Sequence, residues 1–328
     1  MKTQINWGII ATGGIARKFA EDFRFVENGT LLAVASRSQD KAQHFANDFH
    51  IERAYGSYEA LAEDPDVDAV YVATPHDTHV ELSKMCLEKG KAVLCEKPMA
   101  VNAAQLESLL DTAEKSGKFL MEAMWTYFMP VVRQAKKWVN DGRIGNIKMI
   151  QADFGFKTPD NPKDRLYNPA LAGGALLDIG IYPLAIAHYF APGEIADIKA
   201  SAIKADTGVD QTLGLVLTYD DDIIANLTAS FRFQMENAAY VYGDEGYVKI
   251  HGNFWHPHKA VLMKDSGIED IVEDDRLSTG YDYETNAMTQ WLLEGKKESP
   301  VVPFSWSRKS VETMDKIREL IGVKYPFE

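Results

Sequence analysis

Histidine, glutamate and lysine side chains stand directly after two apolar segments in the first third of the chain. The segment VYVATPHDTH runs into His76 and His79, and AVLCEKPMA runs into Glu96 and Lys97. Such groups can hold an anionic ligand or move a proton during a reaction. The histidine pair could also suggest a metal site, but no partner carboxylate or cysteine cluster accompanies it, and we expect no metal. The candidate ligand contacts in these segments are Thr74, Pro75, His76, His79, Glu96 and Lys97.

A second group with acid–base chemistry lies in the segment GGALLDIGIYPL. Asp178 and Tyr182 are four residues apart, so on a helix they share one face. Pro183 follows directly and would disturb a helix near the carbonyl four residues before it, so this geometry is not guaranteed. From the residues alone, the plainer interpretation is a core helix with one capped aspartate and one amphipathic tyrosine.

The N-terminal stretch NWGIIATGGIARKF has features of a phosphate-binding turn. The dinucleotide fingerprint is G-x-G-x-x-G after a strand, and this chain has Ala11, Gly13 and Ala16 at the three positions. Gly13 keeps the middle role, which is close approach of the backbone to a pyrophosphate, and alanine is an accepted third residue. Ala11 is the departure, because the turn prefers a residue without Cβ, and it predicts a slightly displaced turn. The motif alone also fits an ordinary strand–turn–helix; a cofactor would contact Thr12, Gly13, Gly14 and Ile15.

The residues after the next apolar segment bear on the choice of cofactor. A NAD-binding fold normally has Asp or Glu there, about twenty residues past the glycines, for the ribose 2′-hydroxyl. The segment ASRSQDK instead supplies Ser36, Arg37 and Ser38, with Lys41 one turn into a helix. An arginine flanked by hydroxyls suits a 2′-phosphate, so we expect NADP, with NAD less favoured. The alternative is a solvated loop arginine, and Asp40 is more simply a helix first-turn residue.

These segments need a scaffold that brings them together, and the alternation of strand and helix patterns over residues 1–123 supplies one. Uniformly apolar strands joined through helices indicate a doubly wound parallel sheet of the α/β class, covered on both faces. Ligands bind at the carboxyl ends of the strands in such sheets. We expect Ser38 and Ser57 to begin helices and Gly90 and Gly117 to end them. The expected strands are 6–10, 30–36, 68–74, 92–96 and 119–124, and the expected helices are 14–26, 38–50, 57–64, 79–90 and 102–117.

Residues 124–328 have a different pattern, in which strand follows strand. The links YDDD and GDEG resemble hairpin turns, so this region is expected to be an α+β domain with a large, mostly antiparallel sheet. We expect two helices to close the chain, beginning near Tyr281 and Ser307. Earlier in this region we expect a helix over 131–142, a polar loop over 157–174 and a helical stretch over 175–190, with strands over 146–156, 195–205, 211–219, 223–233, 238–243, 246–252, 259–264 and 267–273.

Composition narrows the function classes. The chain has 328 residues and a net charge of −13, with acidic side chains scattered along it, which argues against nucleic acid or an anionic membrane as the main partner. The start MKTQINW has no signal-peptide pattern, and no run approaches the length of a membrane span. The two cysteines, Cys86 and Cys95, exclude a disulfide framework. A cytoplasmic enzyme or binding protein that takes a small-molecule substrate fits best.

Three motifs together suggest a family. ATPHDTH, CEKPMA and GGALLDIGIYPL occur in order, and with them nearly the whole chain resembles the glucose–fructose oxidoreductase / inositol dehydrogenase (Gfo/Idh/MocA) family. The segments AYGSYEALAEDPDVDAVYVAT, GKAVLCEKPM and FLMEAMWTYF look like the branch that holds the dimeric dihydrodiol dehydrogenases and the NADP-dependent D-xylose dehydrogenases. The resemblance implies a Rossmann domain over 1–123 and a domain with an open sheet over 124–328. It also implies a homodimer or homotetramer formed through that sheet.

The resemblance also implies a site. It makes Lys97 the lysine beside the nicotinamide, and Asp178 and Tyr182 the residues that face it from the second domain. Most of the wider family has histidine where Tyr182 stands, which puts inositol-type substrates in doubt. The expected reaction is NADP-dependent hydride transfer to or from a CH–OH or C=O group of a sugar, diol or related carbonyl compound. Free tyrosine, with a pKa near 10, is a poor base, so Lys97 would lower the pKa of Tyr182, while Asp178 would orient either a substrate hydroxyl or the lysine.

Aromatic residues provide candidates for a substrate wall. Trp125 follows the last strand of the first domain, and Met124 and Trp125 are expected near the cofactor. Phe154, Phe156 and Trp255 are further wall candidates, although Phe154 also fits core packing and Trp255 a plain loop. His256 and His258 are expected in solvent. The candidate substrate contacts are Trp125, Phe154, Asp178 and Tyr182.

Two other functions fit the same fold. Some relatives cleave glycosides with bound NAD through a transient oxidation, and the polar loop before GGALLD could suit a sugar. A non-catalytic regulator that senses NADP is the other alternative, because fold does not fix function. The arginine environment at Arg37 argues against the first, and the presence of Lys97, Asp178 and Tyr182 argues against the second.

Overall fold

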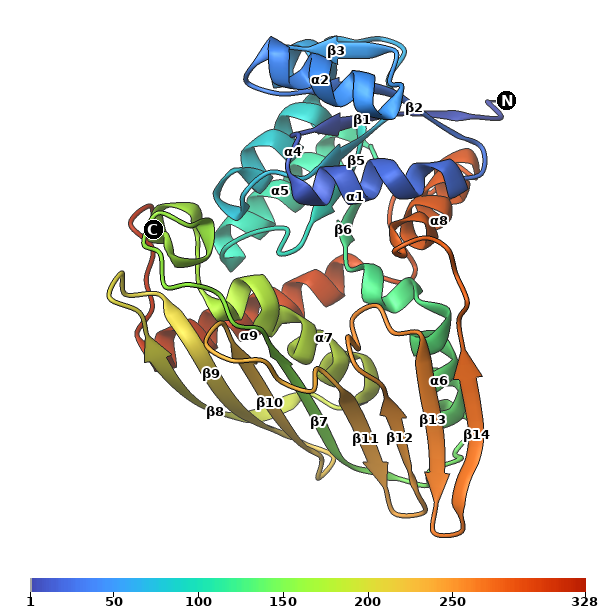
Figure 1. Ribbon diagram of the computed structural model, residues 1–328, viewed down its shortest axis with the longest axis vertical. Coiled ribbons are helices and arrows are strands. Elements are labelled where there is room, and N and C mark those ends of the chain that lie inside the picture. The colour runs from blue at the N-terminus through green and yellow to red at the C-terminus, as the bar shows by residue number, and fades with distance from the viewer. Residues whose placement is uncertain (1) are drawn as a thin grey trace. The chain divides into compact units, whose positions relative to one another are not determined.

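The computed structural model describes residues 2–328, which form two compact units (Figure 1). The first contains the chain up to Trp125 and also Arg276–Arg308, and the second contains Thr126–Asp275 and Lys309–Glu328. The division at residue 123 expected from the sequence does not foresee this return of Arg276–Arg308 to the first unit. The second boundary falls inside helix α9, Phe304–Ile321.

The first unit is built on a parallel sheet of six strands in the order β3-β2-β1-β4-β5-β6. This order is the doubly wound arrangement predicted from the alternating pattern, which is thereby confirmed. The short strand β3 was not expected, because its three residues are only half-buried and form no apolar run. The strands are β1 Ile5–Ile10, β2 Gly29–Ala35, β3 Arg53–Tyr55, β4 Ala69–Val72, β5 Ala92–Glu96 and β6 Leu120–Ala123, and the helices are α1 Gly14–Asp22, α2 Gln39–Phe49, α3 Tyr58–Glu63, α4 His79–Glu88 and α5 Ala103–Ser116.

Local capping explains where several of these helices begin and end. The Ser38 hydroxyl accepts the backbone N–H of Lys41 at 3.4 Å, and the Ser57 hydroxyl accepts that of Ala60 at 3.2 Å, as expected. Gly117 ends α5 with φ +61°, a conformation that favours glycine. These caps place the strand ends that precede α2 and α3 at defined positions.

The returning segment is fixed to the first unit by buried polar contacts. Asp22, at the end of α1 and 3% exposed, accepts the backbone N–H groups of Thr279, Gly280 and Tyr281 at 2.9–3.0 Å. These donors lie at the start of helix α8, Tyr281–Leu293, so the carboxylate caps that helix from a distant part of the chain. The indole N–H of Trp7 on β1 also donates to the Thr289 hydroxyl at 3.2 Å.

The second unit is built on a sheet of eight strands in the order β14-β13-β12-β11-β7-β10-β9-β8. Only the β7–β10 pair is parallel among the pairings of the residues described, so the predicted mostly antiparallel sheet is confirmed. Helices α6, Pro130–Asn140, and α7, Ile181–Phe190, cover one face of this sheet (Figure 1). The strands are β7 Ile147–Gly155, β8 Ile195–Lys204, β9 Asp210–Tyr219, β10 Ile224–Ser230, β11 Ala239–Gly243, β12 Tyr247–Ile250, β13 Lys259–Lys264 and β14 Gly267–Glu273.

The apolar stretch before α7 does not form a regular α-helix. Leu176–Gly180 forms a π-helical turn that runs directly into α7. Pro183 is the third residue of α7, a position in the first turn where a missing N–H costs little. The disturbance of the helix expected from this proline is found in the π-helical turn that precedes α7. By length and composition the segment Pro169–Phe190 could cross a membrane, which corrects the expectation that no run approaches such a length, but 89% of its apolar window is buried in the fold. Buried core helices have the same composition.

Candidate functional site

The parallel sheet of the first unit brings the predicted strand-end residues to one edge. Strands β1, β2, β4 and β5 are adjacent and point the same way, so the residues after Ile10, Ala35, Val72 and Glu96 lie at their common carboxyl edge. Among the cofactor candidates, Gly13, Gly14, Ile15 and Arg37 are exposed and Thr12 is half-buried. Such an edge is the usual ligand site of a doubly wound sheet.

The turn after β1 has the features that a pyrophosphate needs. Helix α1 begins after Gly13 with no side-chain cap and no acidic residue in its first turn. A Cβ placed on Gly13 or Gly14 would meet no atom within 4 Å, so these glycines leave open space at the N-terminus of the helix. Helix N-termini of this kind bind phosphate groups. The residues present therefore fit a dinucleotide.

Ala11 takes a backbone conformation that glycine prefers. Its φ is +103°, and its N–H donates to the carbonyl of Ala35 at 3.0 Å. The backbone at this alanine is therefore locally strained, since a residue with a Cβ rarely adopts this conformation.

The residues after β2 differ in their exposure to solvent. Ser36 is buried, whereas Arg37 and Lys41 are exposed cations. The Ser38 hydroxyl is engaged as the cap of α2. Burial raises the pKa of the Asp77 carboxyl, and the nearby Arg37 charge opposes that rise. Arg37 and Lys41 are thus the groups here that can meet a phosphate.

The two histidines have different surroundings. The His79 ring is fully buried, with Nδ1 2.8 Å from the Pro98 carbonyl oxygen and Nε2 2.8 Å from the Thr74 carbonyl oxygen. Burial lowers the pKa of His79, against the effect of the two carbonyl groups. His79 therefore ties the loop after β4 to the loop after β5, while the His76 ring, 8% exposed, lies 5.7 Å away. Among residues 2–328 no three His, Cys, Asp or Glu side chains are grouped to hold a metal.

The loop that carries Lys97 is fixed by two acids, the half-buried Glu96 and the buried Glu122. Glu96 accepts the Tyr71 hydroxyl in a short hydrogen bond and the Lys97 backbone N–H at 3.3 Å. Glu122, on β6, accepts the Met99 backbone N–H at 2.9 Å. The Lys97–Pro98 peptide is cis. The Lys97 side chain itself is half-buried.

The second unit holds Asp178 and Tyr182 among aromatic rings. Asp178, on the π-helical turn, accepts from the Arg165 guanidinium at 2.8 Å, and Tyr182 is 7% exposed. The Phe154 ring stacks on Trp255 with centroids 3.6 Å apart and lies 5.7 Å from the Tyr182 ring. Phe154 thus packs in the core and also supports an aromatic wall beside the tyrosine.

Other predicted residues lie deeper than expected. In the first unit Trp125 is 5% exposed and stacks on Tyr281, with centroids 4.3 Å apart. Met124 is fully buried. In the second unit His256 is half-buried and only His258 is exposed.

The sequence interpretation missed three residues that support these groups. Tyr71 lies inside an ordinary apolar strand pattern, and Tyr281 begins a helix in a polar segment, so nothing local marks either residue. Arg165 lies in the polar loop before GGALLD, and an arginine in a loop that leads to an acidic turn was the available signal.

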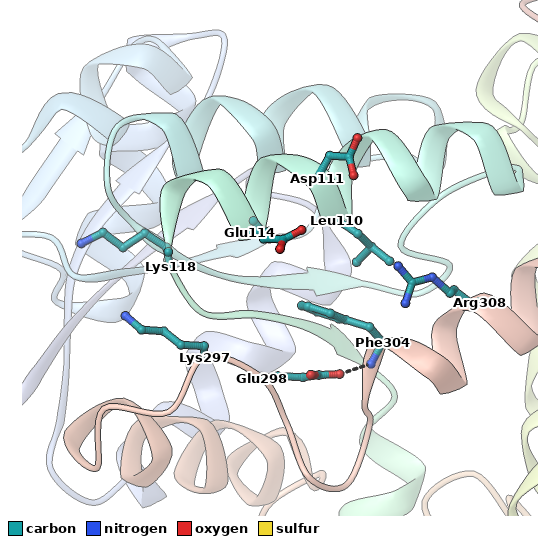
Figure 2. Close-up of a pocket in the computed structure, with 10 residues that line it drawn as sticks. Leu110, Asp111, Glu114, Lys118, Lys297, Glu298, Phe304 and Arg308 are labelled. Carbon is teal, nitrogen blue, oxygen red and sulfur yellow. Dashed lines mark hydrogen bonds between the residues drawn. The ribbon is translucent and has the colours of Figure 1, made fainter.

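A cavity of about 420 Å³ in the first unit contains none of the predicted site residues (Figure 2). It lies between α5 and the segment that leads into α9, and its lining is mostly exposed, with charges of both signs. Glu298 there is bound to the backbone N–H of Phe304 at 2.5 Å. We assign this cavity no part in the site.

Comparisons with known proteins identify the family of the chain. Residues 5–124 match the model of an oxidoreductase family with an NAD-binding Rossmann fold, and residues 132–249 match that of the GFO/IDH/MocA C-terminal domain. Trans-1,2-dihydrobenzene-1,2-diol dehydrogenase of Xenopus tropicalis is 36% identical over 98% of this chain and 99% of its own length. The Homo sapiens enzyme of the same name is 34% identical over 98% of each chain.

Solved structures give the same result. An aldose-aldose oxidoreductase from Caulobacter crescentus, complexed with glycerol, has a TM-score of 0.88 and 25% identity over 97% of each chain. A 3-ketoreductase from Actinomadura kijaniata, in complex with NADP and TDP-benzene, has a TM-score of 0.85 and 28% identity over 97% of this chain and 98% of its own. This protein belongs to the Gfo/Idh/MocA oxidoreductase family.

Proposed function

We propose that this protein is an NADP-dependent oxidoreductase that interconverts a CH–OH group and a C=O group in a sugar, diol or related small carbonyl compound. The observation that carries the proposal is Tyr182, a phenol set beside an aromatic wall and on the same helical stretch as Asp178. Its relatives include dihydrodiol dehydrogenases and a 3-ketoreductase, which act on such groups by name.

The preference for NADP is supported by the charges after β2. Arg37 and Lys41 are exposed cations at the position where a dinucleotide fold selects the 2′ substituent, and no acid replaces them. An arginine guanidinium binds a phosphate through paired hydrogen bonds, whereas it gains little from a ribose hydroxyl. The 3-ketoreductase neighbour was solved with NADP.

The residues of this chain supply binding and proton transfer. When bound, the nicotinamide supplies the hydride acceptor or donor. In oxidation Tyr182 would take the proton of the substrate hydroxyl while the substrate carbon gives up a hydride. In reduction Tyr182 would return a proton to the substrate oxygen. We propose that Lys97 serves the same proton transfer, and that Asp178 orients a substrate hydroxyl.

Association between copies of the chain is part of the proposal. The outer face of the eight-stranded sheet presents Val216 and Ile224, exposed at 38% and 43%, together with the stacked rings of Tyr240 and Tyr242. Apolar side chains gathered on an open sheet face are typical of an interface. A homodimer or homotetramer through this face is therefore proposed. Light scattering should give a lower mass for Val216→Arg than for the native protein, and an unchanged mass would contradict the proposal.

A coupled screen tests the reaction. The protein is incubated with aldoses, polyols, diols and dicarbonyls in both directions, with NADP or NAD, and formation or loss of NADPH is followed by absorbance. We expect turnover with NADP and at least one of these classes. Release of a glycoside aglycone without net NADPH would identify a hydrolase instead, and NADP binding without any turnover would identify a regulator.

A variant tests the choice of cofactor. Arg37→Ala should weaken NADP binding about 10-fold or more while leaving NAD binding unchanged, because a charge-assisted hydrogen bond contributes about 1.5–3 kcal/mol. Lys115→Ala, at an exposed lysine on α5, is the matched control and should change neither. Equal weakening of both cofactors by Arg37→Ala would contradict a role at the 2′-phosphate.

A further inference from the structure

We propose that Asp210 and Tyr325 are positioning residues for the reaction, because they hold the π-helical turn Leu176–Gly180. This turn carries Asp178 and leads directly into α7, on which Tyr182 lies. The inference rests on the proposed function. It gives a role to the glycine pair of the motif GGALLD, to which that function assigns none. All of these residues lie in the second unit.

Asp210, the first residue of β9, accepts the backbone N–H at the start of the turn. Its Oδ2 lies 2.6 Å from the backbone nitrogen of Leu176, and the residue is fully buried. The first N–H groups of a helix have no partner within the helix, and an anion placed there also interacts favourably with the helix dipole. A carboxylate from a distant strand therefore caps this turn two residues before Asp178.

The glycine pair before the turn is packed against the same carboxylate. Gly174 has φ +127°, and a Cβ on it would clash with Oδ1 of Asp210 and would lie 3.5 Å from the Tyr325 hydroxyl oxygen. The Gly174 N–H donates to the Leu166 carbonyl at 2.9 Å. A larger residue at this position would displace the carboxylate, so glycine is needed where the chain passes Asp210.

The C-terminal tail, residues 323–328, lies beside the glycine pair (Figure 1). The buried Tyr325 hydroxyl donates to the Gly173 carbonyl at 2.8 Å. The Tyr325 backbone N–H donates to the Glu328 carboxylate at 3.0 Å, and the same carboxylate accepts the Arg318 guanidinium of α9 at 2.7 and 2.9 Å. The hydroxyl that holds the glycine pair therefore comes from an anchored segment.

The burial of Asp210 is unfavourable for the fold, which indicates a role other than stability. Its Oδ1 has no hydrogen-bond partner among the residues that the structure describes. Burial raises the pKa of Asp210 to about 6, against the effect of the Leu176 N–H. The charges of Arg318 on α9 and Lys204 on β8 also oppose the rise, and the Tyr325 hydroxyl faces the carboxyl from the tail. A buried charge with one unused oxygen needs an explanation, and function is a common one.

A small shift of this turn would reach the groups proposed to react. The Asp178 N–H donates to the Gly174 carbonyl at 3.3 Å, and Tyr182 follows on the same continuous helical stretch. Misplacement of a reacting group by about 1 Å can lower a rate about 100-fold. Loss of the cap, or of the hold on the glycine pair, should therefore lower kcat while leaving the binding of NADP to the first unit unchanged.

The test compares Asp210→Asn and Tyr325→Phe with Asp244→Asn. Asp244 is a matched control in the same unit, since its Oδ1 fills the space of a Cβ on Gly145 and it accepts the Asn146 N–H at 2.8 Å. It is exposed and lies in the β11–β12 hairpin, which holds no predicted site residue.

Three quantities are measured for each variant. The first is kcat and KM with NADP between pH 5 and pH 8, with D-xylose and trans-cyclohexane-1,2-diol as probes; if neither is a substrate, the best compound of the coupled screen replaces them. The second is Tm, and the third is amide hydrogen exchange over residues 174–182, followed by mass spectrometry.

We expect Asp210→Asn to lower kcat about 10-fold at pH 7.5, as for a charge-assisted hydrogen bond that becomes neutral, with the KM for NADP unchanged. Exchange over residues 174–182 should be faster than in the native protein. At pH 5 most of the native Asp210 is protonated, so the difference in kcat should largely disappear. Tyr325→Phe should lower kcat about 3- to 10-fold at every pH, as for a lost neutral hydrogen bond.

Stability should change in the opposite direction to activity. The pKa of Asp210 in the folded protein lies above the unfolded value of about 3.9, so native stability falls as pH rises from about 4 to about 6, and Asp210→Asn lacks this fall. At pH 7.5 the Tm of Asp210→Asn should therefore be no lower than that of the native protein. Asp244→Asn should leave both kcat and the exchange over residues 174–182 unchanged.

Native kcat together with native exchange in Asp210→Asn would overturn the inference. So would a loss of kcat that accompanies a lower Tm and that Asp244→Asn reproduces, because the role would then be structural. If the native protein turns over no compound of the screen, the proposed function fails. The exchange over residues 174–182 then decides by itself whether Asp210 holds the turn.

Discussion

Asp22 fixes the returning segment to the first unit through several buried hydrogen bonds, and its replacement gives a quantitative prediction. Its Oδ2 accepts the N–H groups of Gly280 and Tyr281 at 2.9 and 3.0 Å and the Thr279 hydroxyl at 2.6 Å, while the Thr279 N–H lies 2.9 and 3.0 Å from its two oxygens. Bonds to a charged acceptor contribute about 1.5–3 kcal/mol each, and an anion at a helix N-terminus adds up to about 2 kcal/mol. These contributions overlap, so they do not simply add.

We expect Asp22→Ala to lower the free energy of unfolding of the first unit by about 3–5 kcal/mol, because it leaves buried N–H groups without acceptors. Asp22→Asn keeps one oxygen but loses the charge, and about 1–2 kcal/mol is expected. In a unit of this size each kcal/mol lowers Tm by about 2–4 °C, so the alanine variant should melt about 10 °C below the native protein.

Scanning calorimetry, with the unfolding of this unit assigned by tryptophan fluorescence, measures the effect. Asp48→Ala is the control, since Asp48 in the same unit makes an exposed ion pair with Arg17 and should contribute less than about 1 kcal/mol. An Asp22→Ala variant that melts together with Asp48→Ala would refute the argument that this carboxylate fixes α8.

Two further substitutions test local conclusions. Ala11→Gly should raise the stability by about 0.5–1 kcal/mol, because relief of about 1–2 kcal/mol of strain at φ +103° exceeds the added freedom of the unfolded chain, and a fall in Tm would contradict this. Glu284 on α8 is fully buried, and burial, with the Glu96 charge, raises its pKa well above the usual range. The folded protein then keeps a proton that the unfolded chain releases above about pH 4.3, so stability falls as pH rises. Glu284→Gln should remove this fall, and its Tm should gain on the native protein from about pH 5 to about pH 8; parallel pH profiles would contradict the assignment.

The parallel sheet and the strand-end residues could be predicted because their signals are local. Strands buried on both faces, such as Ala69–Val72, give uninterrupted apolar runs, and the edge they share follows from their common direction. Glycines and serines marked most helix ends for the same reason. Up to Met124 the first unit therefore follows from the sequence, except for the short strand β3 and for the end of α1, which lies at Asp22 and not at residue 26.

What the sequence could not supply depends on contacts between distant segments. The α8 segment joins the first unit through Asp22, more than 250 residues earlier in the chain. The π-helical turn at Asp178 forms where Asp210, from β9, accepts the Leu176 N–H at 2.6 Å. His79 seemed available to a ligand, yet both its nitrogens face carbonyl groups of neighbouring loops. No pattern within a short window contains these partners.

We propose that Tyr182 and Lys97 serve proton transfer in an NADP-dependent reaction, and a pair of variants tests this role. Turnover of the best substrate from the screen and the dissociation constant of NADP are measured for Tyr182→Phe and Lys97→Met. We expect a loss of about 10²- to 10⁴-fold in kcat for each variant, as for a general acid–base group, with NADP binding largely intact. Unchanged turnover in both variants would contradict it.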